Sequence, residues 1–259
     1  MSVNQSRVVA GRWLGWFVGG LAAVFPVLTF AADLRVMTTS FPPYVIFDEA
    51  TNEAHGPAVD VINRICVLSQ TNCEIHVEPW ARAYATALEQ PNTLIFSIAR
   101  RPDRETKFKW IGTVAPYQVR LFALDRNGVQ ATDNWRELSD FHVAGQLGDV
   151  KAQYLQNSGF DVEMVPSAEA TIRMLYAGRA DLIAGDALSL PYRVRMLDVD
   201  SNRLKVVARI PELSSDLYLA ASLATDDDAV EVLRAALDQL KNSGSYDQIW
   251  AMTTSSPSN

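Results

Sequence analysis

Three arginines lie close together directly after an apolar segment of the chain. Residues 93–98 have the short apolar pattern of a buried strand, and Arg100, Arg101 and Arg104 follow it. A guanidinium group presents a rigid fork of N–H donors that can hold a carboxylate through two parallel hydrogen bonds. The turn is therefore a candidate anion-binding site. The alternative is a solvated charged turn, because acidic residues alternate with the arginines.

The arginine-rich turn lies in a chain that alternates short apolar segments with helical patterns. The strand pattern occurs at residues 34–37, 73–77, 93–98, 108–111, 142–146, 162–165, 180–184 and 204–210. The helix pattern occurs at residues 57–70, 80–89, 148–158, 168–177, 188–197, 226–241 and 246–250. This alternation is typical of βα units, so the sequence predicts an α/β protein with largely parallel sheets.

The alternation restarts in the middle of the chain as a second α/β unit of similar length. We expect residues 32–122 to form the first part of one lobe and residues 123–213 to form a second lobe. Residues 214–252 then return to the first lobe, and residues 253–259 form a polar, disordered tail. The joining segments, 119–125 and 214–221, are apolar and strand-like, which predicts a hinge of two strands.

The first 31 residues have the three parts of an export signal. Arg7 and Arg12 precede an apolar stretch over residues 13–28, and small residues lead to a predicted cleavage after Ala31. The alternative is a transmembrane anchor, because the apolar stretch is near the lower length limit for crossing a bilayer. We favour the signal peptide, which predicts a periplasmic protein.

Charge and histidine content exclude two classes of function. The chain has a formal net charge of −7 and no basic run, which argues against nucleic acid as a partner. His55, His76 and His142 are scattered, and none of them has metal-ligand spacing to the cysteines. We therefore expect no metal and no cofactor.

The two cysteines, Cys66 and Cys73, lie seven residues apart. Cys66 is on the apolar side of a predicted helix and Cys73 begins a predicted strand. An oxidising compartment would allow a local disulfide between the helix end and the strand start. The alternative is a pair of free buried thiols.

A second group of candidate binding residues follows the first predicted strand. Thr39 lies among hydroxyl residues, and Phe41 and Tyr44 flank Pro42 and Pro43. The double proline predicts a rigid extended loop. Its two aromatic rings could form one wall of a polar ligand pocket, or could fill the core beneath the loop.

Several short segments, spread over the whole chain after residue 31, match one known family in type and in order. They are residues 34–44, Gly56 with Asp60 and Val61, Cys66 and Cys73, Ser97-Ile98 with the Arg104 turn, Gly148-Asp149, Ala180-Asp181, Gly185-Asp186 and residues 244–250. Together they resemble the periplasmic solute-binding proteins of family 3, which serve polar amino-acid ABC transporters. The resemblance implies a two-lobe type II periplasmic-binding-protein fold, with two hinge strands and a ligand cleft between the lobes. The cysteine spacing is that of the disulfide in histidine- and lysine/arginine/ornithine-binding relatives.

The resemblance also implies a function and a set of roles. The family's arginine for the α-carboxylate corresponds to Arg104, with Ser97 nearby, and the acid for the α-ammonium corresponds to Asp186. Main-chain N–H groups of Gly148, Asp149 and Val150 would add donors to the carboxylate. The implied function is a monomeric periplasmic receptor that closes on an amino acid or similar zwitterion and delivers it to an ABC permease in the inner membrane.

Some of these residues have a second interpretation, and some depart from the family pattern. Asp186 could instead cap the following helix, and Trp80 could lie against the ligand or fill the core. Ala99 replaces a hydroxyl residue, and Thr39 replaces the acid found in relatives that select basic side chains. Asp149 stands where a hydroxyl residue is commoner, either as a helix-start residue or as a receiver of a ligand cation. The first two departures argue against a basic amino acid as the ligand.

Two other functions are compatible with the same fold. One is a cleft enzyme of the cyclohexadienyl or arogenate dehydratase type, with Glu78, Glu105 or Asp149 as the acid that protonates a leaving group. The other is a receptor that docks onto a membrane sensor. The roles of Arg100 and Arg101 stay open.

Overall fold

The computed structural model contains two five-stranded sheets, and it describes Met1, residues 33–125 and residues 128–255. The predicted signal peptide, residues 1–31, lies outside the described residues apart from Met1. Within the described ranges, no helix is long and apolar enough to cross a membrane. The α/β class predicted from the sequence is confirmed. The expectation of largely parallel sheets is wrong, because half of the neighbouring strand pairs in each five-stranded sheet are antiparallel.

The first sheet is mixed, with strands from both ends of the described chain. In spatial order its strands are β4 (Cys73–Val77), β1 (Leu34–Thr38), β5 (Thr93–Ala99), β12 (Leu217–Ser222) and β6 (Phe108–Ala115). β1 pairs in parallel with β4 and β5, whereas β12 runs antiparallel to β5 and β6. The late strand β12 thus lies inside a sheet built mostly from the first part of the chain, which we call the first lobe.

The second sheet is built from the middle of the chain. In spatial order its strands are β11 (Leu204–Arg209), β7 (Val119–Leu124), β10 (Leu182–Asp186), β8 (Val143–Gln146) and β9 (Val162–Val165). β8 is parallel to β9 and β10, and β7 is antiparallel to β10 and β11. We call this sheet and its helices the second lobe.

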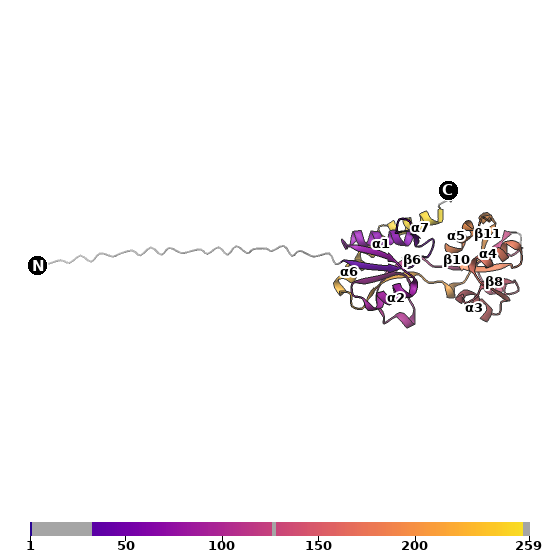
Figure 1. Ribbon diagram of the computed structural model, residues 1–259, viewed down its shortest axis with the longest axis horizontal. Helices are drawn as coiled ribbons and strands as arrows, with labels where there is room; N and C mark the ends of the chain where they lie inside the picture. The colour runs from indigo at the N-terminus through magenta and orange to yellow at the C-terminus, as the bar shows by residue number, and fades with distance from the viewer. Residues whose placement is uncertain (2–32, 126–127, 256–259) are drawn as a thin grey trace. The chain divides into compact units, whose positions relative to one another are not determined.

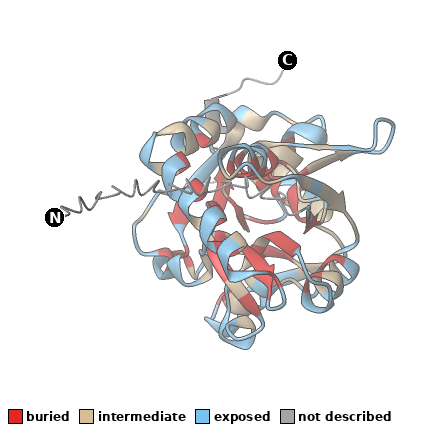
Figure 2. Ribbon diagram, turned by 90° about the vertical axis from the view of Figure 1, so that its left-hand side faces the viewer, coloured by how far each residue is buried: buried red, intermediate tan, exposed pale blue. Residues whose placement is uncertain are grey.

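Helices cover both faces of each sheet (Figure 1), and buried residues occur along the strands and the helices (Figure 2). On the first sheet, α1 (Pro57–Leu68), α6 (Asp227–Asn242) and α7 (Ser245–Ser255) pack on one face and α2 (Trp80–Glu89) on the other. On the second, α3 (Val150–Asn157) packs on one face and α4 (Ala168–Ala177) and α5 (Ser189–Met196) on the other. Successive side chains of a strand point to opposite faces of the sheet, and in β1 Val36 packs on the side of α1 whereas Met37 packs on the side of α2.

The chain passes between the sheets at two short segments rather than at the predicted boundary. We expected the chain to join the lobes over residues 119–125, with the lobe boundary between residues 122 and 123. Because β7 already pairs with β10 and β11, the crossing lies at residues 116–118. An apolar strand in a sequence does not reveal which sheet it joins, which explains the error. The return crossing lies at residues 210–216. Its Ser215 N–H donates to the Tyr117 carbonyl of the first crossing (3.0 Å), and its Ile210 N–H donates to the Val119 carbonyl at the start of β7 (2.9 Å).

The double-proline loop is a tight turn and not the extended segment that the sequence predicts. Because Pro42 and Pro43 have no N–H, the turn is closed by Phe41 and Val45, whose main chains exchange hydrogen bonds of 2.8 and 3.0 Å. Gly56, with φ of 117°, holds the turn against α1. A Cβ there would lie 2.8 Å from the main-chain oxygens of Pro43 and Tyr44.

Two further elements differ from the prediction. A hairpin of β2 (Ile46–Asp48) and β3 (Glu53–His55) follows the turn and was not predicted, because three-residue strands carry too little periodicity. Helix α7 continues to Ser255, past the predicted helix end at Trp250 and into the predicted tail. Residues 256–259 of that tail lie outside the described residues.

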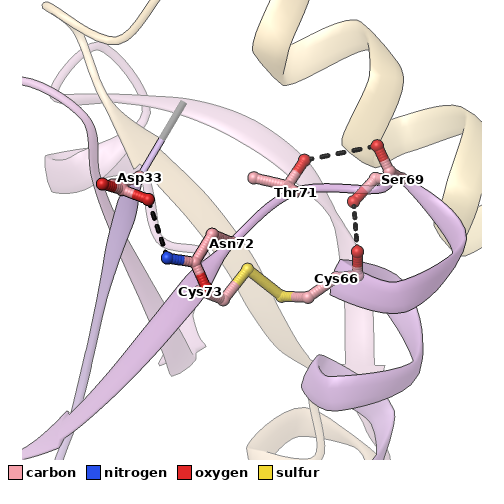
Figure 3. The surroundings of a disulfide bond; sticks show 6 residues. All are labelled: Asp33, Cys66, Ser69, Thr71, Asn72 and Cys73. Atoms are coloured by element: carbon pink, nitrogen blue, oxygen red, sulfur yellow. Dashed lines mark hydrogen bonds between the residues drawn. A yellow bond between two sulfur atoms is a disulfide. The ribbon is translucent and has the colours of Figure 1, made fainter. Parts of the chain in front are cut away.

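The predicted disulfide between Cys66 and Cys73 is present (Figure 3). It joins the last turn of α1 to the first residue of β4. The intervening turn is ordered by the Asn72 side chain, which donates to the Asp33 carboxylate (2.7 Å), and by the Ser69 hydroxyl, which donates to the Cys66 carbonyl (3.1 Å). The disulfide therefore holds the C-terminal end of α1 beside the start of β4 in the first sheet.

Replacing both cysteines by alanine should lower the free energy of unfolding by about 2 kcal/mol. The disulfide restricts the unfolded chain, so its removal raises the entropy of the unfolded state, and the effect is modest because the closed loop is short. Urea denaturation with and without a reductant measures the effect. The reductant should destabilise the wild type and leave the double variant unchanged, and equal stability of the two proteins would contradict the prediction.

His142 should make stability depend on pH. Its ring lies 2.8 Å from the Asp161 carboxylate and 3.3 Å from that of Glu163, and the hydrogen bond to Asp161 raises the pKa of His142 above its usual value. The raised folded-state pKa means that the stabilisation is complete below the ordinary histidine pKa of about 6.5 and is lost as the pH rises through the raised value.

Thermal denaturation of His142→Gln beside the wild type, at about pH 5.5 and about pH 8.5, tests this. The variant should lose more stability at the lower pH. His55→Gln is the matched control, since His55 is exposed and has no ion pair among the described residues. A larger loss at the higher pH would contradict the sign.

Candidate functional site

A pocket of about 120 Å³ lies at the carboxyl ends of β8 and β10, and we call it the β8–β10 pocket. Its polar lining consists of Tyr117, Gln146, Asp149, Lys151, Thr171, Asp186, Ser189 and Arg193, and Phe41 from the first lobe covers part of it. Parallel strands end at one edge of a sheet and place the following helix starts there, which is where open α/β folds bind ligands.

Asp186 is a buried carboxylate whose oxygens are occupied by protein donors. Its side chain accepts hydrogen bonds from the Ser189 N–H (2.9 Å), the Leu188 N–H (3.1 Å) and the Gln118 N–H (3.1 Å). The Tyr44 hydroxyl lies 2.9 Å from each of the two carboxylate oxygens. The residue is 4% exposed, so these donors replace the water that a buried charge requires.

Tyr44 brings the first lobe to this carboxylate. Its ring is fully buried and stacks on Phe41, with 4.9 Å between ring centroids, and its hydroxyl also lies 2.8 Å from the Pro116 carbonyl oxygen. Burial and the Asp186 charge raise the pKa of Tyr44, so the hydroxyl keeps its proton and shares it among these acceptors. Asp186 thereby connects the turn after β1, the first crossing and the start of α5.

Two cations line the same pocket. The Lys151 ammonium lies 2.8 Å from the Asp149 carboxylate, and both side chains are about four-fifths buried, at 18% and 21% exposure. Asp149 also caps α3, since its other oxygen accepts from the Lys151 N–H (2.7 Å). Arg193, on α5, donates to Glu169 (3.2 Å). Each cation keeps N–H donors that no described group uses.

Arg104 differs from its two neighbours in the arginine-rich turn. Arg100 pairs with Glu105 and Arg101 with Asp103. Arg104 has no carboxylate partner in the described ranges. It donates to the Ala99 carbonyl (3.2 Å), and its guanidinium lies 5.8 Å from the Trp80 ring centroid and 5.3 Å from that of Tyr84.

Two hydroxyls near the carboxyl ends of β1 and β5 are buried without a hydrogen-bond partner among the described residues. They belong to Thr38 and Ser97, on two strands that pair in parallel. Ser97 also has φ of 59°, a left-handed conformation that side chains rarely adopt, at an irregularity in the pairing of β5 with β12. Unpaired buried hydroxyls and an unusual backbone are features that gather at binding sites.

This site geometry lies on a chain that matches a known protein family over most of its length. Residues 34–252 match the family described as bacterial extracellular solute-binding proteins, family 3. The chain belongs to this family. The resemblance predicted from short segments is thereby confirmed, and with it the type II periplasmic-binding-protein fold.

Solved structures of similar fold include other solute-binding proteins, at low sequence identity. The L-cystine solute receptor of Neisseria gonorrhoeae, in an unliganded open conformation, superposes with a TM-score of 0.71 at 16% identity, covering 84% of this chain and 90% of that one. Substrate binding domain 2 of Lactococcus lactis GlnP gives 0.69 at 14% identity, covering 87% and 97%. An arginine transport system periplasmic binding protein of Legionella pneumophila gives 0.63 at 13% identity, covering 85% and 99%. A comparison with curated proteins gives no match.

The predicted site residues of this family member fall into two groups. Phe41, Asp149 and Asp186 line the β8–β10 pocket. The other predicted residues do not line it: Thr39, Tyr44, Trp80, Ser97, Ala99, Arg104, Gly148 and Val150. Among these, Trp80 and Ala99 contact Arg104. Trp80 also packs against the core, as its core-filling interpretation expects, and its contact with a ligand stays a prediction. Asp186 receives the N–H groups at the start of α5, as the capping interpretation expects.

Lys151 and Arg193 were not predicted from the sequence. A signal was present for Lys151, because it lies in the first turn of a helix, where the helix dipole disfavours a cation. A cation at that position needs a local carboxylate or a function, and Asp149 supplies the carboxylate. Arg193 gave no such signal, because it lies in the last turn of α5, where cations are ordinary.

Replacing Tyr44 by phenylalanine should lower the free energy of unfolding by about 1–3 kcal/mol, because it removes a donor from a buried carboxylate. Chemical denaturation measures the loss. Tyr192→Phe is the matched control, since the Tyr192 hydroxyl has no hydrogen bond in the described part of the chain. Equal stability of the two variants would show that the Tyr44 hydroxyl does not hold Asp186.

Proposed function

We propose that this protein is an exported receptor that binds an amino acid or a similar small molecule between its two lobes and delivers it to an ABC permease. Membership of the solute-binding family supports the binding role. The relatives named for L-cystine and arginine support an amino-acid-like ligand. The predicted signal peptide and a periplasmic location belong to this proposal.

The observation that carries the proposal is the unpaired guanidinium of Arg104. Three arginines share one turn, and only Arg104 lacks a carboxylate within the described ranges. The Trp80 and Tyr84 rings and the Ala99 carbonyl hold it in place while leaving most of its N–H donors unused. A positioned arginine with free donors is suited to bind the carboxylate of a ligand, as the family resemblance implies.

The two crossings between the sheets would act as the hinge. Residues 116–118 and 210–216 hydrogen-bond to each other, and they are the chain connections between the two sheets. Arg104 belongs to the first lobe and the β8–β10 pocket to the second. A ligand that contacts both gains interactions only when the lobes approach, so its binding favours the closed state.

The contacts of the candidate acids favour binding over catalysis. A general acid must hold a proton near neutral pH, which requires a raised pKa. Glu78 pairs with Arg82, Asp149 with Lys151 and Glu105 with Arg100, and the hydrogen bond from Arg100 lowers the pKa of Glu105. Each of the three candidate acids is thus paired with a cation of the protein itself, so the dehydratase alternative is not favoured.

Titration calorimetry of the purified protein against an amino-acid panel tests the receptor function. At least one member should bind, and Arg104→Ala should weaken that binding by about 10- to 100-fold, the value of a lost charge-assisted contact. Arg101→Ala is the matched control in the same turn, because Arg101 is paired with Asp103 on the surface. Binding that is insensitive to Arg104→Ala would contradict the assigned role, and absence of binding by the whole panel would contradict the function.

A further inference from the structure

We propose that the ligand carries two carboxylates, one for Arg104 and one for Lys151, with Arg193 as a second donor to the latter. This inference rests on the proposed function, because it names the ligand class of the same cleft. It comes from the donors and acceptors that the β8–β10 pocket leaves unused.

The pocket has N–H donors to spare. An ammonium group has three donors, and Lys151 uses one of them for Asp149. A guanidinium group has five donors, and Arg193 uses one of them for Glu169. Both side chains line the pocket, so their remaining donors are available to a ligand.

The acceptors of the pocket are already engaged. Both oxygens of Asp186 are occupied by three main-chain N–H groups and the Tyr44 hydroxyl, so little capacity remains for a ligand cation. Both oxygens of Asp149 are engaged by Lys151, one as acceptor from its main-chain N–H and the other in the ion pair with its ammonium. A cationic ligand side chain would compete with these internal bonds, whereas an anionic group meets free donors.

The Ser189 hydroxyl is a separate observation that points to a ligand. The residue is 7% exposed, lines the pocket, and its Oγ has no partner among the described residues. A buried hydroxyl without a partner costs free energy, and a ligand carboxylate would accept its proton. Ser189 lies one turn before Arg193 on α5, so both can serve the same anion.

The position of Lys151 also favours a role in binding. A cation in the first turn of α3 opposes the helix dipole, and holding an ion pair about four-fifths buried has a desolvation cost. These costs are offset when the ammonium receives a ligand anion next to the start of α3.

Two sources of this chemistry are possible, and the experiment separates them. One is a dicarboxylic amino acid, and the other is a dicarboxylate without an ammonium group. Calorimetry would compare L-glutamate and L-aspartate with their amides, L-glutamine and L-asparagine, and with succinate, glutarate and L-arginine. We expect at least one dicarboxylate to bind about tenfold or more tightly than its amide or than L-arginine, because the amide loses a charge-assisted contact.

Variants connect this preference to the pocket. Lys151→Met should reduce dicarboxylate binding about tenfold or more and reduce amide binding by less, because a neutral amide oxygen accepts a weaker hydrogen bond from the ammonium than a carboxylate does. Lys205→Met is the matched control, since Lys205 pairs with Asp125 on the same lobe and does not line the pocket. If Lys151→Met does not fold, the double variant Asp149→Asn with Lys151→Met removes both charges and replaces it in the same comparison.

The outcomes separate the two claims. A neutral or basic amino acid that binds more tightly than every dicarboxylate, with binding abolished by Arg104→Ala, would overturn this inference and leave the receptor function intact. A dicarboxylate preference that survives Lys151→Met would also overturn it. No binding by any compound would overturn both. Preference for succinate or glutarate would assign the ligand to acids without an ammonium group.

Discussion

The buried carboxylate of Asp186 is the constraint on which the arrangement of the cleft depends. A charge taken out of water is tolerated only when hydrogen bonds replace its hydration, and those bonds come here from three separate parts of the chain. Tyr44 comes from the turn after β1, Gln118 from the first crossing, and Leu188 and Ser189 from the start of α5. Satisfying one charge therefore fixes α5 beside the hinge and presents Ser189 and Arg193 to the pocket.

The remaining charged groups of the cleft divide into carboxylates that are already engaged and cations that keep unused donors. The carboxylates that sequence comparison suggests for a ligand cation, Asp149 and Asp186, are occupied by donors of the protein itself. The cations, by contrast, keep unused donors: Arg104 on the first lobe, and Lys151 and Arg193 on the second. An acceptor-rich ligand held between the lobes would complete this set.

Local pattern was sufficient to predict most of the elements and the α/β class, because helix and strand periodicity and proline positions act over a few residues. Assignment to a sheet was not predictable at β7, since an apolar strand pairs equally well in either sheet. The three arginines of one turn could not be separated either, because the partners of Arg100 and Arg104 depend on side-chain placement. The bond from Tyr44 to Asp186 joins residues far apart in sequence, so the sequence left two interpretations of Asp186 open. The only sequence signal for Lys151 was its position in the first turn of a predicted helix, where the helix dipole disfavours a cation.

The most direct test of the two-carboxylate site is a crystal structure of the protein with its preferred dicarboxylate bound. The account predicts one carboxylate within about 3 Å of the Arg104 guanidinium and the other within about 3 Å of the Lys151 ammonium, both at hydrogen-bond distance. A ligand that contacts neither residue, or whose cationic group displaces Tyr44 from Asp186, would contradict it.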